Sequence, residues 1–311
     1  MNSIIEEKVI IQGENKIGAT ISRPDDKKRP LVLLIMGTGK LDRDGNKKGF
    51  ESNIYKNLSD MFVNMGYVCI RYDKRGTHES TGNFNATGLS DLVNDSASVI
   101  EYAKNLPYVD KERIIACGHS EGAMIATLLT KQEKLESVIL LGGACICLRS
   151  AMEYQNFRVL DEFANKRGIV AWYINKLLNK EKIKKQLTAL YQKAKNAKKD
   201  TFFFRGAFLP AKWLKEHGEL SDEDYIKMLE DYNGKVLAIT GKGDLQADYT
   251  CLEKLKEFEN VITYAPDNVN HLLREIDDNN SILTVQKQYK RLIKKPIHEG
   301  IKIQIEEFLK S

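Results

Sequence analysis

The sequence predicts an α/β protein whose mostly parallel sheet is covered by helices and interrupted by one helical insertion. Short runs rich in β-branched residues alternate with segments whose apolar residues recur every three or four positions. The central runs are apolar throughout, which is typical of strands buried on both faces. With 311 residues, 42% of them hydrophobic and 29% charged, the chain can form about two domains, or one large domain carrying an insertion.

Eight strands are expected in chain order. The first two are predicted to form an antiparallel pair that turns at Gly13–Asn15, and the later ones should form the buried part of the sheet. The expected strands are Val9–Ile11, Ile17–Ile21, Leu31–Ile35, Val68–Tyr72, Arg113–Cys117, Val138–Leu141, Val236–Thr240 and Val261–Tyr264. Helical spacing of apolar residues predicts covering helices at Ser52–Met65, Leu89–Asn105, Glu121–Lys131 and Gly300–Leu309.

The interval from Arg149 to Tyr232 breaks this alternation. It contains no convincing strand, and its helical pattern predicts an insertion of residues 149–232 into a core made of residues 1–148 and 233–311. The net charge of +5 belongs to this interval, which holds 17 basic and 12 acidic residues, whereas the remainder is balanced. Its expected apolar stripe consists of Tyr173, Leu177, Leu187, Leu190, Tyr191 and Ala194.

Net charge, the N-terminal sequence and the cysteines indicate the expected location and exclude some classes of partner. A net charge of +5 on 311 residues does not favour a nucleic-acid binder. The acidic N-terminal stretch does not resemble a signal peptide, and no apolar run reaches the ~20 residues of a membrane helix. The five cysteines (Cys69, Cys117, Cys145, Cys147 and Cys251) are odd in number and lie mostly in apolar segments. We therefore expect free thiols, a cytoplasmic location and no integral membrane association.

The strongest chemical signal is the sequence Gly118-His119-Ser120-Glu121-Gly122. It follows an apolar strand and opens a helical segment, which is the context that a G-x-S-x-G nucleophile elbow requires. In such an elbow the serine sits in a strained turn with its oxygen exposed, and the glycines leave room for neighbouring backbone. The helix N-terminus then favours developing negative charge nearby. Ser120 is therefore the candidate nucleophile.

A nucleophilic serine needs a base and an acid that orients the base. In α/β sheets with this elbow the acid and then the histidine follow late strands, and the candidates are Asp244 and His271. Both come just after expected strands, at the carboxyl ends where open α/β sheets build their sites. Asp248 is the competing acid, although it is a better start for the next helix. His119 should point away from the serine oxygen, and His298 is expected near the surface.

An oxyanion hole requires two backbone donors. One should be the amide of Glu121, directly after the nucleophile. We expect the second from the loop after Leu31–Ile35, at the amide of Thr38, because Gly37 and Gly39 allow a ligand to approach the backbone closely. A nucleotide-binding interpretation of these glycines is weak, since no third glycine or G-K-[ST] motif follows.

With these motifs the chain resembles α/β-hydrolases of the serine esterase and serine aminopeptidase-like group. The resemblance covers almost the whole chain outside the insertion. It is carried by Leu33–Gly39 with Asp42–Asn46, by Arg71-Tyr72-Asp73-Lys74-Arg75-Gly76, by Gly118–Gly122, and by the Asp244 and His271 loops. It implies the α/β-hydrolase fold, with an eight-stranded sheet and residues 149–232 acting as a cap over the active site. His78 departs from the family pattern, which has glycine there.

Two polar groups in these motifs are expected to be structural. Asp73 and Arg75 should form hydrogen bonds near the end of their strand rather than act in catalysis. The Asp42–Asn46 loop should fix the oxyanion segment, and its spacing does not match a calcium loop.

The function expected from these residues is hydrolysis of a small-molecule carboxylic ester through an acyl-enzyme, without a metal or an organic cofactor. Thioester, amide or peptide cleavage uses the same groups, and a non-catalytic ligand-binding protein is the other class left open. Trp172, Phe203 and Trp213 are expected to bind substrate together with Gly37 and Gly39. No nucleic-acid partner is expected, and a homodimer remains possible. The lysines after residue 175 could face solvent, or attract anionic substrates or an anionic membrane surface.

Overall fold

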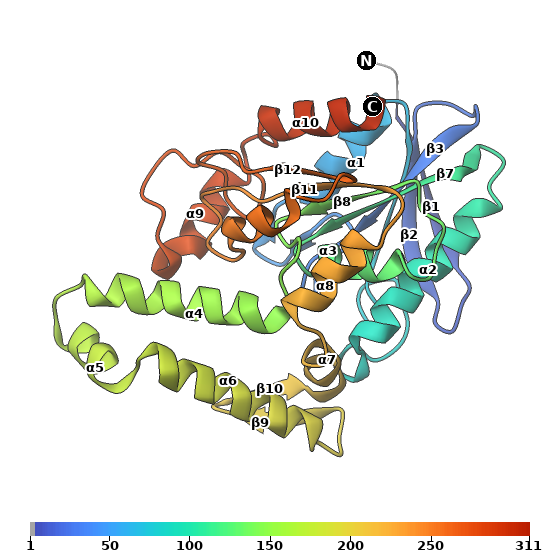
Figure 1. The fold of residues 1–311 in the computed structure, drawn as a ribbon. Helices are drawn as coiled ribbons and strands as arrows, with labels where there is room; N and C mark the ends of the chain where they lie inside the picture. Colours follow the sequence, from blue (N-terminus) through green and yellow to red (C-terminus); the bar gives the residue numbers. More distant parts are fainter. Residues whose placement is uncertain (1–3) are drawn as a thin grey trace.

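The computed structural model describes residues 4–311 and contains the predicted eight-stranded, mostly parallel sheet (Figure 1). The strand order is β1-β2-β6-β3-β7-β8-β11-β12. β1 pairs antiparallel with β2 and β2 with β6, while the other neighbours are parallel. The strands are β1 (Ile5–Ile11), β2 (Ile17–Arg23), β3 (Arg29–Ile35), β6 (Val68–Tyr72), β7 (Val109–His119), β8 (Ser137–Leu141), β11 (Lys235–Ile239) and β12 (Val261–Tyr264).

The central strands bury both faces, as their apolar sequences predict. In β3, Leu31, Leu33 and Ile35 belong to one apolar cluster and Val32 and Leu34 to the other, because successive side chains of a strand alternate between faces. Helices α2 (Leu89–Lys104) and α3 (Glu121–Leu129) pack in the first cluster. Helices α1 (Ile54–Asn64) and α10 (Glu299–Lys310) pack in the second. The sheet is therefore a middle layer with helices on both sides.

Most of the elements between β8 and β11 lie below the sheet in Figure 1, while the last of them packs against α3. Helices α4 and α6 run alongside one another and are joined by α5. A small apolar cluster of their own holds these helices together, and α6 contributes Ile183, Leu187, Leu190 and Ala194 to it. The elements are α4 (Leu148–Ala164), α5 (Ile169–Leu177), α6 (Lys180–Lys195), β9 (Thr201–Phe204), β10 (Ala207–Pro210), α7 (Ala211–His217) and α8 (Asp222–Glu230).

Two expectations about this segment were wrong. The sequence predicted no strand here, yet β9 and β10 form an antiparallel hairpin in which Phe203 pairs with Phe208. Its two-residue turn, Arg205–Gly206, has positive φ at both positions (48° and 92°), which is typical of tight hairpin turns. The expected apolar stripe also divides, because α5 ends at Leu177 and α6 begins at Lys180. As a result Tyr173 and Leu177 are exposed.

The remaining elements are short and connect the core. Among residues 4–311, no helix is both long enough and apolar enough to cross a bilayer. The connecting elements are β4 (Asn46–Lys47), β5 (Phe50–Glu51), η1 (Phe84–Ala86), η2 (Tyr249–Leu255), η3 (Ile282–Thr284) and α9 (Val285–Leu292).

Candidate active site

Ser120 occupies a strained turn between β7 and α3. Its backbone has φ 58° and ψ −123°, in the positive-φ region that few residues other than glycine adopt. The two flanking glycines are sterically required, since a Cβ on Gly118 would lie 2.0 Å from the carbonyl oxygen of Gly122, and one on Gly122 would lie 2.0 Å from that of Ile35. The amide of Ser120 donates to the carbonyl of Leu141 at 2.8 Å and anchors the turn to β8. The local geometry is that of a nucleophile elbow.

His271 and Asp244 lie together on the loops that follow β12 and β11. His271 Nδ1 donates to Asp244 Oδ2 at 2.8 Å, and both side chains are buried. Asp244 Oδ1 accepts the amides of Gln246 and Ala247 at 2.7 and 3.0 Å, which fixes the carboxylate. Because a carboxylate only accepts, Nδ1 carries the proton and Nε2 is left as the basic nitrogen.

Ser120 and His271 line the same cavity. The hydrogen bonds found over residues 4–311 include none from Ser120 Oγ to His271 within 3.5 Å. Such catalytic contacts often shorten only when substrate is bound. The alternative acid, Asp248, caps η2 by accepting the amide of Thr250 at 3.0 Å. His298 precedes α10, where its own amide donates to Leu273.

The two predicted oxyanion donors border this cavity. Glu121 is the first residue of α3, where backbone amides have no acceptor within the helix. Thr38 lies in the loop after β3, and its amide makes no hydrogen bond to another described residue. Gly37 packs closely against Ser120, since a Cβ at that position would lie 2.9 Å from Ser120 Cβ. The loop thus brings free backbone donors next to the serine.

A buried relay of Tyr55 and His119 joins the oxyanion loop to the histidine loop. The amide of Gly37 donates to Tyr55 Oη at 2.7 Å, and Tyr55 Oη contacts His119 Nδ1 at 3.1 Å. His119 Nε2 lies 2.8 Å from the carbonyl oxygen of His271 and must donate to it. Burial, and then the nearby His271, lower the pKa of His119 to about 3, so the ring is neutral and Tyr55 donates to Nδ1.

His119 was expected to point away from the serine oxygen, and both of its ring nitrogens bond to other groups; its contact with Tyr55 was not predicted. A tyrosine in the first turn of an amphipathic helix gives no sign of its partner. The contact depends on how α1 packs on the sheet, where it lies against β6 and β3.

The Glu121 side chain forms a second buried network that the sequence did not reveal. Its carboxylate pairs with Lys74 and accepts from Trp213 Nε1 at 2.5 Å and His217 Nε2 at 3.1 Å. Burial raises the pKa of Glu121, but Lys74 and His217 outweigh it and hold the pKa well below its usual value. Because Trp213 and His217 belong to α7, these bonds tie α7 to Glu121, the residue that follows Ser120.

The cavity over Ser120 has a volume of about 430 Å³ and lies between the core and the inserted segment. Apolar side chains of both parts line it, among them Met124, Ile146, Leu148, Met152 and Leu190. Gly37, Gly39 and Trp213 lie on its wall as expected. A smaller cavity of about 310 Å³ adjoins it and shares Thr38, Gly39, Lys40, Glu121 and Trp213.

Trp172 and Phe203 are not part of either cavity wall. They are 55% and 52% exposed, and the expectation that they bind substrate in this pocket is corrected. Their aromatic character suggested a pocket. Whether these two side chains face solvent or the cavity depends on how α5 and β9 pack against α4 and α6.

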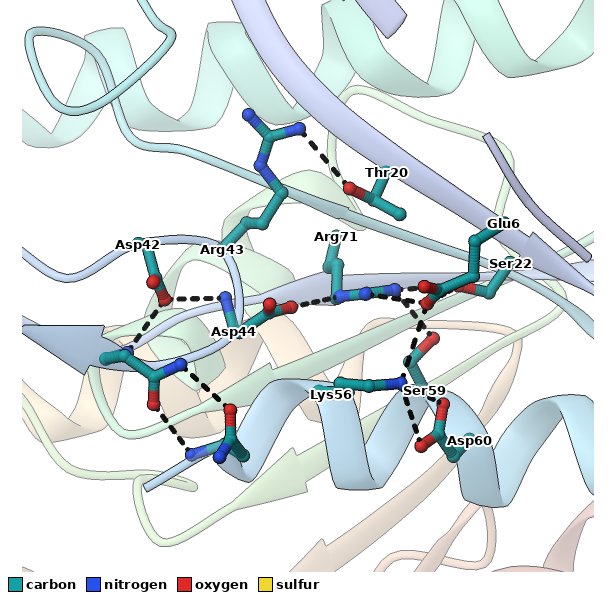
Figure 2. Close-up of polar contacts among 12 residues, drawn as sticks. Glu6, Thr20, Ser22, Asp42, Arg43, Asp44, Lys56, Ser59, Asp60 and Arg71 are labelled. Carbon is teal, nitrogen blue, oxygen red and sulfur yellow. Dashed lines mark hydrogen bonds and ion pairs between the residues drawn. The ribbon is translucent and has the colours of Figure 1, made fainter. Parts of the chain in front are cut away.

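A polar network fixes the Asp42–Asn46 segment, which follows the Gly37–Gly39 loop in the chain. Asp42 Oδ1 accepts the amides of Asp44 and Asn46 at 3.0 and 2.8 Å. Figure 2 shows Arg71 lying between Asp44 and Glu6, with contacts of 2.5 and 2.8 Å. These contacts to backbone amides and between side chains are structural, in line with the expectation for the Asp42–Asn46 loop.

Asp73 and Arg75 also have structural contacts. Asp73 accepts the amide of Arg43 at 2.8 Å and pairs with its guanidinium, while Arg75 forms a two-pronged pair with Asp95 at 2.7 and 3.0 Å. Neither residue lines the cavity over Ser120.

Comparisons with known proteins agree with this architecture. The curated esterase EstD of Thermotoga maritima is 24% identical over 249 residues, or 78% of this chain, and the chain spans about half (54%) of that relative. Est1E of Butyrivibrio proteoclasticus, solved with ferulic acid, has a TM-score of 0.58 at 18% identity, over 93% of this chain and 99% of that one. The Pyrococcus furiosus esterase Pf2001 has a TM-score of 0.57 at 16% identity, over 99% of this chain and 91% of that one.

These structural likenesses, at low identity, establish the fold. The model of the family described as serine aminopeptidase, S33, matches residues 48–251, which is more than half of the chain. The matched span includes helix α1, the turn at Ser120 and the loop of Asp244. The chain therefore belongs to the serine aminopeptidase S33 family of α/β-hydrolases.

Proposed function

We propose that the protein is a carboxylic ester hydrolase in which Ser120, His271 and Asp244 form a catalytic triad. The observation that carries the proposal is the strained Ser120 turn facing a cavity shared with His271, whose other ring nitrogen is bonded to buried Asp244 at 2.8 Å. These are the nucleophile, base and orienting acid that acyl transfer requires. The esterases among its relatives and structural neighbours make an ester the first choice of substrate.

In the proposed mechanism Ser120 Oγ attacks the ester carbonyl carbon while its proton passes to His271 Nε2. The negative oxygen of the tetrahedral intermediate accepts hydrogen bonds from the amides of Thr38 and Glu121. The intermediate collapses, the carbon–oxygen bond to the alcohol breaks, and His271 returns the proton to the leaving alcohol. Water then attacks the acyl-enzyme with His271 again as base, releasing the acid and restoring Ser120. Asp244 stabilises the imidazolium in both halves.

We further propose that residues 149–232 act as a cap that shapes the substrate pocket. The cavity is closed on one side by Met152 and Leu190 of this segment and by the adjoining Leu148, and its lining is largely apolar. A volume of about 430 Å³ suits an ester of modest size with an apolar acyl or alcohol part.

The proposal is tested with a fluorophosphonate probe, which reacts with activated serines. We expect labelling of the wild type at Ser120 and none in Ser120→Ala, whereas the control Ser98→Ala, at a partly exposed position of α2, should label like the wild type. Absence of labelling at Ser120 in a folded protein would refute the proposal.

A substrate panel distinguishes ester cleavage from its alternatives. p-Nitrophenyl esters of increasing acyl length are compared with acyl thioesters and with aminoacyl amides. Highest kcat/KM on esters is expected. Preference for thioesters or amides would assign the same triad to that chemistry, and ligand binding without turnover would favour a non-catalytic protein.

A further inference from the structure

Helix α5 exposes nearly all of its large apolar side chains. Ile169, Val170, Trp172, Tyr173 and Leu177 are each 54–78% exposed. At 3.6 residues per turn these positions fall on one continuous side of the helix, and Ala171 and Ile174 fall on the other. Ala171 is buried and Ile174 packs against the apolar cluster of the insertion. The helix therefore buries its smaller apolar side and leaves the larger one uncovered, which marks an interaction surface.

Basic residues precede and follow this surface along the chain, and one of them, Lys180, also lies 3.7 Å from the carboxylate of Asp161. Residues 166–185 contain seven basic side chains (Lys166, Arg167, Lys176, Lys180, Lys182, Lys184 and Lys185) and one acidic side chain, Glu181. The ammonium of Lys176 lies 4.7 Å from the centre of the Trp172 ring, so charge and aromatic surface are directly adjacent. Figure 1 shows α5 where α4 and α6 meet, at the end of the inserted segment remote from the sheet. The surface is thus accessible without any movement of the core.

We propose that α5 and its basic flank, residues 166–185, dock onto an anionic lipid bilayer. An aliphatic and aromatic side flanked by lysines is the pattern of helices that lie in the membrane interface, where the apolar side enters the headgroup boundary and the cations contact anionic lipids. Nine residues of helix are far too short to cross a bilayer, so the helix lies along its surface. This proposal does not depend on the catalytic one.

The charge of the surface selects the bilayer over other partners. A second copy of this chain would bring the same excess of positive charge to the contact, and the two flanks would repel one another. A nucleic acid would match the charge but would leave Ile169, Val170 and Leu177 without apolar contacts. An anionic lipid surface offers contacts both to the basic side chains and to the exposed apolar side chains.

The test is co-sedimentation of the full chain with vesicles of phosphatidylcholine alone or with about 30% phosphatidylglycerol, at about 0.1 M salt. Binding is expected only with the anionic vesicles, and it should weaken at about 0.5 M salt because the charges are screened. A cation near an anionic surface contributes roughly fivefold to binding, so Lys182→Gln with Lys185→Gln should reduce partitioning roughly 10- to 30-fold. Lys287→Gln with Lys290→Gln, which removes the same charge from exposed positions on α9, should leave it unchanged.

Replacing exposed apolar residues of α5 by serine tests the apolar contribution to membrane binding. Ile169→Ser with Leu177→Ser should reduce partitioning at least about tenfold, because two exposed aliphatic side chains can no longer enter the bilayer. Ile303→Ser, at an exposed position of α10, should leave partitioning unchanged. Trp172 fluorescence should shift to the blue on anionic vesicles, and Trp172→Phe should lose that shift while still binding. No partitioning of the wild type into anionic vesicles would overturn the proposal. So would dimerisation in sedimentation velocity that the α5 variants abolish, since the surface would then cover a second copy.

Discussion

Replacing Lys74 by methionine tests whether the buried network around Glu121 holds the site together. The Lys74 side chain is 4% exposed and that of Glu121 2%, so neither charge is solvated by bulk water. Methionine keeps most of the apolar volume of lysine but removes the charge. The Glu121 carboxylate would then retain only Trp213 and His217 as partners among the described residues.

The expected loss of stability in Lys74→Met follows from the burial of the Lys74–Glu121 pair. Removing one partner of a buried ion pair destabilises a protein by about 3–5 kcal/mol, because the remaining charge stays buried without compensation. Lys74→Met should therefore lower the free energy of unfolding by about that amount at pH 7. The matched control is Lys134→Met, whose side chain is 84% exposed and pairs with exposed Glu112, and which should cost less than about 1 kcal/mol.

Urea denaturation followed by circular dichroism measures Lys74→Met, Lys134→Met, Glu121→Gln and the double variant Lys74→Met with Glu121→Gln. The double variant should lose less than the sum of the single losses, since no charge is left unpaired. Equal loss in Lys74→Met and Lys134→Met, or strictly additive losses in the double variant, would refute the reasoning.

The pH dependence gives an independent check. The pKa of Glu121 lies below its ordinary value of 4.5 in the folded protein, so its contribution to stability is complete above that pH and is lost as the pH falls below it. Without Lys74, burial dominates and the pKa of Glu121 should rise. The deficit of Lys74→Met relative to the wild type should therefore be largest near pH 7 and narrow on acidification. A deficit that is constant from pH 7 to pH 4 would contradict this account.

Two further substitutions probe the turn and the relay. Gly118→Ala places a Cβ 2.0 Å from a backbone oxygen and should abolish soluble, active protein, whereas Gly13→Ala, with no neighbour closer than 3.5 Å, should express normally; comparable yields would show that the elbow can rearrange. Tyr55→Phe leaves the buried amide of Gly37 and Nδ1 of His119 unpaired and should cost about 1–3 kcal/mol in urea denaturation. It should also lower kcat roughly 10- to 100-fold with little change in KM, because the oxyanion loop shifts, and wild-type kcat on a p-nitrophenyl ester would argue against the relay as a positioning device.

Local sequence was sufficient to predict the core of the fold. Apolar runs and helical periodicity located all eight strands of the main sheet and the main covering helices, because burial on two faces or one leaves a repeating pattern in residues close together in the chain. The elbow at Ser120 was also predictable, since its strained turn depends on immediate neighbours, Gly118 and Gly122. The turn chemistry of the β9–β10 hairpin, Arg205–Gly206, was present in the sequence but was outweighed by the helical pattern around it.

The order of residues along the chain predicted Asp244 and His271 as acid and base, but only the folded structure shows their 2.8 Å contact. The sequence by itself determined which residues could do chemistry and on which elements they lie. The tertiary structure decided which of them meet: Lys74, Trp213 and His217 around Glu121, and Tyr55 with His119 beneath the oxyanion loop. It also placed Trp172 and Phe203 on the surface rather than in the pocket. Side-chain direction on a half-buried helix or hairpin is fixed by packing between segments distant in the chain, and such contacts leave no local pattern in the sequence.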